Sequence, residues 1–171
     1  MERIQEIGYN DSMYRAQKYV SVNENGVKWY TKEKCRMNKH IEDAMEIRNE
    51  QPMVCNCAQT ILRVYAKELG LSPEQAEKLG SNFGGGMKCG GTCGVITSGL
   101  LVLGGKEIES PAKIGEFRRR IAENHDGMTD CKLLLKANAE RGGNKKEHCD
   151  GMIREAITLI DELVSVSENK K

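Results

Sequence analysis

Most of the chain carries apolar residues at the three- and four-residue spacing of an amphipathic helix. The pattern predicts a first helix from about Thr31 that stops at Gln51-Pro52, because the residue before a proline resists helical geometry. Further helices are expected around residues 58–69, 73–80, 93–105, 111–121, 129–135 and 148–166. Spacing therefore predicts an all-α fold, a compact bundle of about five to seven helices.

The first part of the chain has a different pattern. The β-prone runs Tyr19–Val22 and Val27–Tyr30 flank an Asn-Gly turn and predict a short β-hairpin-like extension at residues 1–34. We expect a four-cysteine helical domain at 35–167 and a frayed tail at 168–171. Aromatic side chains of the extension suit either a homodimer surface or a lid over the chain's own helices: Tyr9, Tyr14, Tyr19, Trp29 and Tyr30.

A glycine-rich segment, Phe83 to Gly94, holds six glycines and two cysteines in twelve residues. Glycine is too costly in a helix interior for this segment to be one. It lacks the G-K-[ST] ending of a phosphate-binding loop, so a nucleotide site is disfavoured. We instead expect a loop that passes close to a cysteine pocket or to a cofactor, through Gly84, Gly85, Gly86, Gly90 and Gly91.

Composition narrows the partners and the compartment. The 171 residues include 26 Lys and Arg against 25 Asp and Glu, a formal charge of +1, which argues against nucleic acid and anionic membrane surfaces as partners. No run approaches the length of about 18 apolar residues that a membrane span needs, and the start does not resemble a signal peptide. Seven cysteines in such a chain point to metal or redox chemistry, and we expect a reducing cytoplasm.

Four of the cysteines fall at predicted helix beginnings and on apolar stripes: Cys57, Cys93, Cys131 and Cys149. A helix N-terminus favours thiolate and lowers the thiol pKa, so we expect reactive sulfurs that converge on one pocket. The alternative is four separately buried small side chains. Cys55 and Cys89 are candidates for accessory redox roles, whereas Cys35 is expected at the surface.

Several motifs in fixed order identify a resemblance. The string NCAQ at Asn56–Gln59, the run NFGGGM from Asn82, the step TCG from Thr92, Asp130-Cys131 and a last cysteine opening the final helix resemble the redox-active family labelled C_GCAxxG_C_C. The resemblance implies an all-helical domain whose four characteristic cysteines are Cys57, Cys93, Cys131 and Cys149. A similar module looks to be part of split-Soret cytochromes, for which iron–sulfur ligation has been proposed. The chain departs from the family's C-G-A-x-x-G at Val95 and Ser98, and it lacks the C-x-x-C-H of covalent haem.

Three chemistries use the same four thiols, and the sequence leaves all three open. They are ligation of an iron–sulfur cluster, ligation of a zinc ion, and metal-free thiol–disulfide exchange. Zinc is the weaker metal candidate, because zinc modules usually bring their cysteine ligands in closely spaced pairs. Cys89 and Cys93 form the one local pair that resembles this pattern. His148 is expected to point away from Cys149, which disfavours a Cys–His catalytic pair. We thus expect a redox protein with an unidentified redox partner, its status as an enzyme undecided, or alternatively a non-catalytic zinc-stabilised interaction module.

Overall fold

The computed structural model describes residues 3–6, 18–23 and 26–168, and the side chains of residues 39–167. The chain divides into two units, residues 1–39 and residues 40–171. The first unit holds an antiparallel sheet in the order β1-β2-β3, with strands at Arg3–Glu6, Lys18–Asn23 and Gly26–Thr31. In the register of β2 and β3, Asn23 lies opposite Gly26. The turn expected at residues 24–25 and the aromatic side chains expected at a dimer surface lie outside the described residues.

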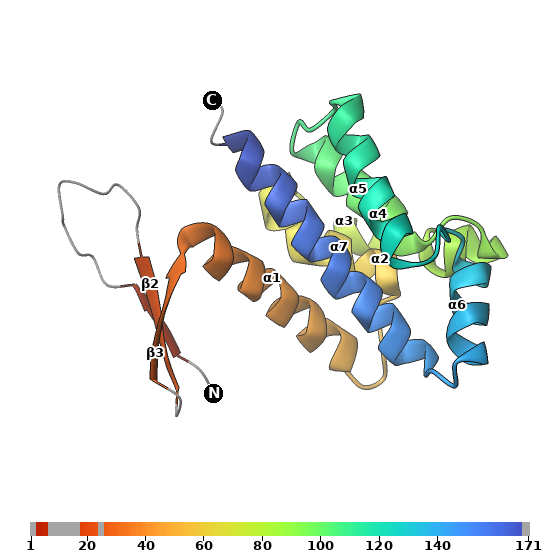
Figure 1. Cartoon of the computed structure of the whole chain (residues 1–171), viewed down its shortest axis with the longest axis horizontal. Coiled ribbons are helices and arrows are strands. Elements are labelled where there is room, and N and C mark those ends of the chain that lie inside the picture. Colours follow the sequence, from red (N-terminus) through yellow and green to blue (C-terminus); the bar gives the residue numbers. More distant parts are fainter. Residues whose placement is uncertain (1–2, 7–17, 24–25, 169–171) are drawn as a thin grey trace. The chain divides into compact units, whose positions relative to one another are not determined.

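The second unit is built from helices, which confirms the predicted helical body (Figure 1). Its α-helices are α1 (Lys32–Asn49, from His40 onward), α2 (Cys57–Tyr65), α3 (Pro73–Gly80), α4 (Gly94–Gly105), α5 (Pro111–Asn124), α6 (Cys131–Glu140) and α7 (Lys145–Glu168). Two shorter pieces complete it, the 3₁₀ turn η1 (Lys67–Leu69) and the irregular turn η2 (Gly86–Gly90). No helix among the described residues is both long and apolar enough to cross a bilayer.

Two helix starts differ from the prediction. Helix α7 begins at Lys145 rather than near His148, because the Asn144 side chain accepts hydrogen bonds from the backbone N–H groups of Lys146 (2.7 Å) and Glu147 (3.3 Å). Helix α6 begins at Cys131, with Asp130 rather than Thr129 at the N-cap. The first shift places Cys149 in the second turn of α7, and the second makes Cys131 the first residue of α6.

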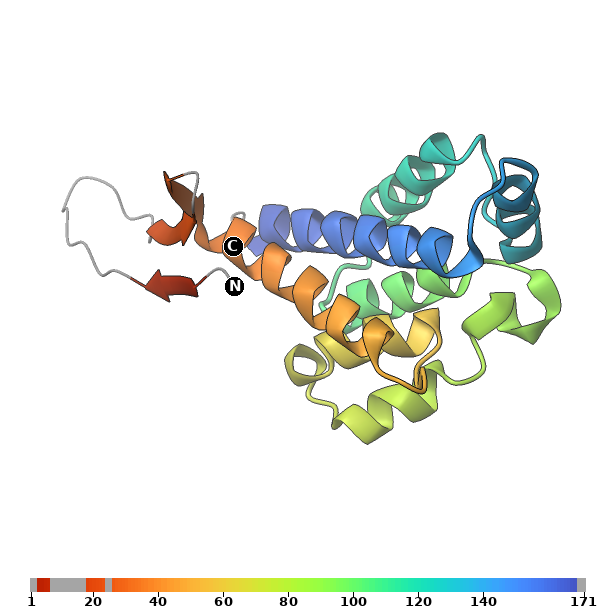
Figure 2. The ribbon, with the colours of Figure 1, turned by 90° about the horizontal axis from the view of Figure 1, so that it is seen from below.

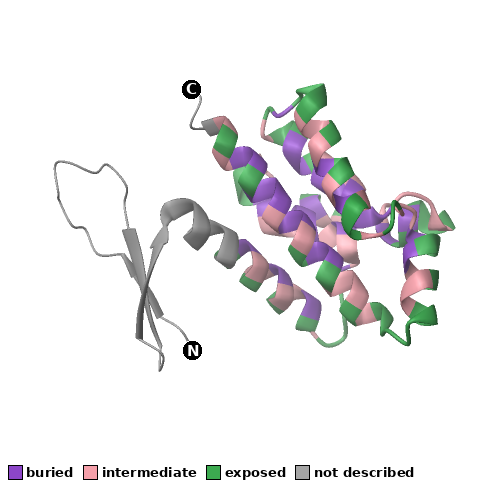
Figure 3. Cartoon of the chain, in the orientation of Figure 1, coloured by how far each residue is buried: buried purple, intermediate pink, exposed green. Residues whose placement is uncertain are grey.

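Helix α7 is the centre of this unit. It contacts α2, α4, α5 and α6, and Figures 1 and 2 show these helices around it. Ile153, Ile157 and Ile160 on its inner face are fully buried, and Figure 3 shows the buried residues as a stripe along the helix. This stripe is the aliphatic core that the apolar spacing predicted.

The close packing of α4 against α5 depends on Gly99 rather than on Ser98. A Cβ on Gly99 would lie 2.4 Å from the ring of Phe117 on α5. Ser98, which stands where the family pattern has glycine, is fully buried and donates its hydroxyl to the Gly94 carbonyl oxygen at 2.7 Å. Its polar group is therefore satisfied within α4 itself.

A buried polar cluster joins α1 to α7. The His40 ring lies between two acids, with Nδ1 at 3.0 Å from Asp161 and Nε2 at 3.0 Å from Glu68. Tyr65 donates its hydroxyl to Asp161 at 2.8 Å. Burial alone would lower the pKa of His40, but the hydrogen bonds and charges of Asp161 and Glu68 raise it to about 9. His40 is therefore a charged link in the interior at neutral pH.

Candidate functional site

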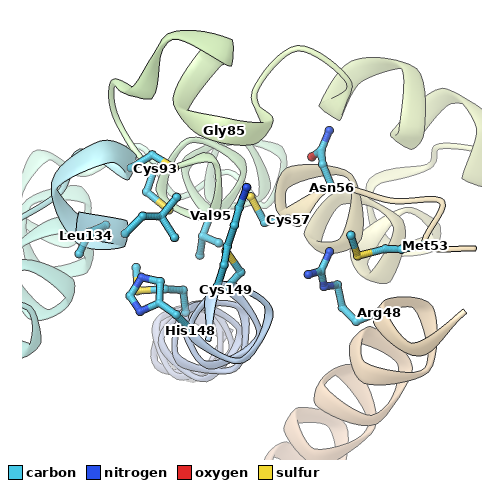
Figure 4. Close-up of a pocket in the computed structure, with 14 residues that line it drawn as sticks. Arg48, Met53, Asn56, Cys57, Gly85, Cys93, Val95, Leu134, His148 and Cys149 are labelled. Atoms are coloured by element: carbon cyan, nitrogen blue, oxygen red, sulfur yellow. The ribbon is translucent and has the colours of Figure 1, made fainter. Parts of the chain in front are cut away.

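The four cysteines at helix starts line one pocket of about 190 Å³, although 36, 38 and 18 residues separate them along the chain. Cys57 opens α2, Cys93 is the N-cap of α4, Cys131 opens α6, and Cys149 lies in the second turn of α7. Figure 4 shows Cys57, Cys93 and Cys149 around the same space. The structure thus gathers the predicted set, while the role of these residues stays a prediction.

The NCAQ string fixes the position of Cys57. Asn56 caps α2 by accepting the backbone N–H groups of Ala58 (2.9 Å) and Gln59 (3.0 Å), and the Gln59 side chain accepts the Asn56 N–H at 2.9 Å. This capping box leaves Cys57 as the first residue of the helix. Gly84 comes so close that a Cβ there would lie 2.5 Å from the Asn56 side chain. The first family motif and the glycine loop therefore pack against each other.

A short backbone pairing brings the starts of α4 and α6 side by side. Thr92 and Asp130 form an antiparallel bridge. The Cys93 N–H donates to the Thr129 carbonyl at 2.8 Å, and the Cys131 N–H donates to the Gly91 carbonyl at 2.7 Å. Cys93 and Cys131 consequently leave adjacent backbone strands into the same pocket.

The glycine loop makes a left-handed turn beside the pocket. Four consecutive residues have positive φ: Gly85 (64°), Gly86 (63°), Met87 (55°) and Lys88 (58°). A Cβ on Gly86 would lie 2.3 Å from the Gly91 carbonyl oxygen and 2.8 Å from the Cβ of Cys131. The turn therefore needs glycine both for its backbone and for its approach to a pocket cysteine.

The other loop glycines have different surroundings. Gly85 lines the pocket itself, whereas Gly84 packs on Asn56. A Cβ on Gly90 would meet Lys132 at 3.0 Å, and one on Gly91 would lie 3.6 Å from the Cys89 sulfur. The loop is thus a backbone wall of the site, and its expected role in binding a cofactor stays a prediction.

Apolar and basic side chains complete the pocket. The apolar ones are Met53, Val95, Leu134, Leu135 and Met152, and the basic ones are Arg48, Lys145 and His148. Sequence reasoning missed Arg48 as a site residue, although a charged side chain on the apolar stripe of the first helix was a usable signal. His148 lines the pocket as well as its neighbour Cys149, and the described side chains include no hydrogen bond between the two, so the absence of a Cys–His catalytic pair stays a prediction. The His148 ring centroid lies 6.2 Å from that of His125.

Burial raises the thiol pKa values, contrary to the expectation from helix N-termini. The pKa of Cys93 is raised to about 12 and that of Cys149 to about 11, chiefly by burial and then by the other pocket cysteines. The pKa values of Cys57 and Cys131 are also raised, again chiefly by burial. Backbone N–H groups of Gly85 and Ala58 do favour the Cys57 thiolate, but they do not outweigh its loss of water. The four thiols are therefore protonated at neutral pH unless a cation displaces the protons.

The two accessory candidates do not line the pocket. Cys55 is buried, and its sulfur accepts a hydrogen bond from Arg63 Nη1 at 3.5 Å. Cys89 is exposed, and its thiol donates to the Gly86 carbonyl at 3.3 Å. All six cysteines with described side chains are free thiols, and the Cys35 side chain lies outside that range. A redox role for Cys55 or Cys89 stays a prediction.

The four cysteine sulfurs are the kind of ligand that iron and zinc bind, but they are not arranged around a single metal position. Four cysteine sulfurs in an apolar pocket are the ligand type of iron–sulfur clusters and of structural zinc. Among residues 39–167, however, no group of three or more His, Cys, Asp or Glu side chains is arranged to hold a metal ion. As they stand, the sulfurs surround a cavity rather than the centre of a single-ion site.

Comparison with known proteins agrees with the motifs. The family described as "Putative redox-active protein (C_GCAxxG_C_C)" matches residues 55–163, well over half of the chain, and its match spans all four pocket cysteines. No curated protein and no solved structure matches the chain. This chain belongs to the C_GCAxxG_C_C family.

Proposed function

We propose that the protein carries electrons through the four-cysteine pocket, and that the group held there is an iron–sulfur cluster. The observation that carries this proposal is one cavity of about 190 Å³ lined by four cysteines from four different helix starts. Family membership supports the redox role. Cys57, Cys93, Cys131 and Cys149 are the proposed ligands, and the cluster would supply a one-electron couple.

The electrostatics of the thiols support a cationic occupant. Thiols with raised pKa values stay protonated at pH 7, and they become good ligands when metal cations take the place of their protons. A cluster has several iron ions and spaces its ligand sulfurs across a core, which suits a cavity between the thiols. The apolar wall of Val95, Leu134 and Met152 would exclude water from the sulfurs.

Thiol–disulfide exchange is the second candidate, favoured by four free thiols that line one pocket. In that chemistry two thiols lose two protons and two electrons to a disulfide or quinone acceptor and form one S–S bond. The attacking species is the thiolate, so raised pKa values would make the exchange slow at pH 7. This is why we place it second.

A zinc-stabilised interaction module has less support. Zinc needs four sulfurs about 2.3 Å from one centre. The described side chains offer no such convergence of three donors.

The iron, sulfide and zinc content of the purified protein distinguishes these three proposals. We expect protein purified without oxygen to be brown, with iron and acid-labile sulfide in equal amounts and a reversible loss of visible absorption on reduction. Stoichiometric zinc in colourless protein would favour the structural module, and metal-free protein with redox-active thiols would favour exchange. We propose a reducing cytoplasm as the location, where such thiols and clusters persist.

A further inference from the structure

We propose that Arg48 is the counter-charge that sets the reduction potential of the four-cysteine pocket. The inference rests on the proposed redox function and extends it to a residue outside the thiol set. Arg48 lies on α1 and lines the pocket (Figure 4). Its side chain is 4% exposed, so its charge acts within a region of low dielectric constant.

Two hydrogen bonds fix the guanidinium. Nε donates to Asp150 Oδ1 at 2.6 Å, and Nη1 donates to the Cys55 carbonyl oxygen at 3.0 Å. These contacts tie Arg48 to the residue after Cys149 and to the segment two residues before Cys57. Nη2 makes no hydrogen bond to any residue whose side chain is described, which leaves N–H groups for a sulfur-based anion in the pocket.

The surrounding charges leave this side of the pocket positive. Asp150 is shared, because Lys146 Nζ also lies 2.7 Å from its second carboxylate oxygen. Lys145 adds another cation to the pocket lining. One half-buried carboxylate thus faces Arg48 and Lys146 together. Arg48 keeps a net attraction for negative charge on Cys57 and Cys149.

A nearby cation raises the reduction potential of a cluster, because reduction adds one electron and makes the pocket more negative. Without metal, the same cation favours the thiolate over the thiol. A purely structural tie between α1 and α7 would affect neither property in a charge-dependent way. A counter-charge role therefore predicts opposite shifts when Arg48 and Asp150 are neutralised, whereas a purely structural role does not.

Charge variants on the two sides of the ion pair supply the test. Arg48→Gln and Asp150→Asn both weaken the same salt bridge, but the first removes a positive charge and the second a negative one. In cluster-loaded protein we expect Arg48→Gln to lower the midpoint potential and Asp150→Asn to raise it. An effect of about tenfold in the equilibrium constant corresponds to about 59 mV for a one-electron couple. Arg48→Lys keeps the charge and should restore most of the shift.

Arg63→Gln is the matched control, because Arg63 bonds the Cys55 sulfur but does not line the pocket. Its midpoint potential should equal that of the wild type. If Arg48→Gln and Asp150→Asn shift the potential in the same direction, or neither shifts it, the counter-charge role is wrong.

Metal-free protein gives a readout that does not depend on the cluster. At pH 8.5 we expect iodoacetamide to alkylate Cys57 and Cys149 about tenfold more slowly in Arg48→Gln and about tenfold faster in Asp150→Asn. Equal rates in the two variants would refute the proposal. If the wild type shows no redox couple at all, the proposed function fails, while these opposite alkylation shifts still decide whether Arg48 is the counter-charge.

Discussion

Gly94, at the start of α4, directly faces the sulfur of Cys57 at the start of α2. A Cβ on Gly94 would lie 3.1 Å from this sulfur and 2.5 Å from the Phe83 carbonyl oxygen. The glycine of the TCG motif therefore allows the first two pocket cysteines to approach one another. Without it, the glycine loop and α4 could not both stay in place.

Gly94→Ala should destabilise the protein by about 1 to 3 kcal/mol, because an extra methyl group in a filled space forces the backbone to move. It should also expose Cys57 to alkylation. Urea denaturation and peptide mapping of the labelled thiols measure the two effects. Gly104→Ala in the same helix is the control, since a Cβ there meets nothing within 4 Å. Equal stabilities of the two variants would contradict the close approach.

The left-handed turn makes a second paired prediction. Gly85 and Gly86 have nearly the same φ, 64° and 63°, but only a Cβ on Gly86 would meet other atoms within 4 Å. Gly85→Ala should therefore cost only the conformational penalty, about 1 to 2 kcal/mol. Gly86→Ala should cost about 1 to 3 kcal/mol more, because it also displaces Cys131. Thermal or urea unfolding of both variants tests this, and equal losses would show that the turn does not press on Cys131.

Local sequence patterns were enough to predict the helices. The environment of each side chain could be known only from the three-dimensional fold. The Ser72-Pro73 and Asn56–Gln59 signals identify helix starts because capping is satisfied by neighbours in sequence. The pKa values of the thiols could not be predicted in the same way. A helix start favours thiolate, but how far burial opposes it depends on segments such as α6 and α7 that arrive from far along the chain.

His148 and Arg48 show the same limit. That His148 lines the cysteine pocket follows from the packing of α7 in the fold and from no pattern in the sequence. Arg48 was visible as a charge on an apolar stripe, but its partner Asp150 lies 102 residues away. No periodicity links two such positions, so only the packing of α1 on α7 reveals the pair.

The pocket thiols should react slowly in metal-free folded protein. Because the pKa values of Cys93 and Cys149 are raised to about 12 and about 11, the thiolate fraction at pH 7.5 is very small. Iodoacetamide should label the exposed Cys89 first, and labelling of Cys149 should increase up to about pH 11. Residue-resolved mass spectrometry measures the order. Alkylation of Cys93 at pH 7.5 as fast as that of Cys89 would be incompatible with its burial.

Stability should fall as the pH rises from 6.5 to 9. The folded pKa of His40, about 9, lies above its ordinary value of 6.5, so its contribution is complete below pH 6.5 and is lost as the pH rises through about 9. The loss should be about 2 to 3 kcal/mol in the free energy of unfolding. Urea denaturation across this range measures it.

Two variants separate the charge of His40 from its packing. His40→Asn should be less stable at pH 6.5 and should lose most of the pH dependence. Tyr65→Phe removes a hydroxyl that donates to Asp161 but keeps the imidazolium, so its stability should be lower while the pH dependence remains. An unchanged slope in His40→Asn would assign the pH dependence to other groups.

The most direct test of a joint four-cysteine site is the iron and sulfide content of single Cys→Ser variants prepared without oxygen. Replacing Cys57, Cys93, Cys131 or Cys149 should each remove most of the iron, sulfide and visible absorption, because each residue supplies one ligand to the same group. Cys55→Ser and Cys89→Ser, outside the pocket lining, should retain the wild-type content. Wild-type content in all four pocket variants, or equal losses in all six, would contradict the account.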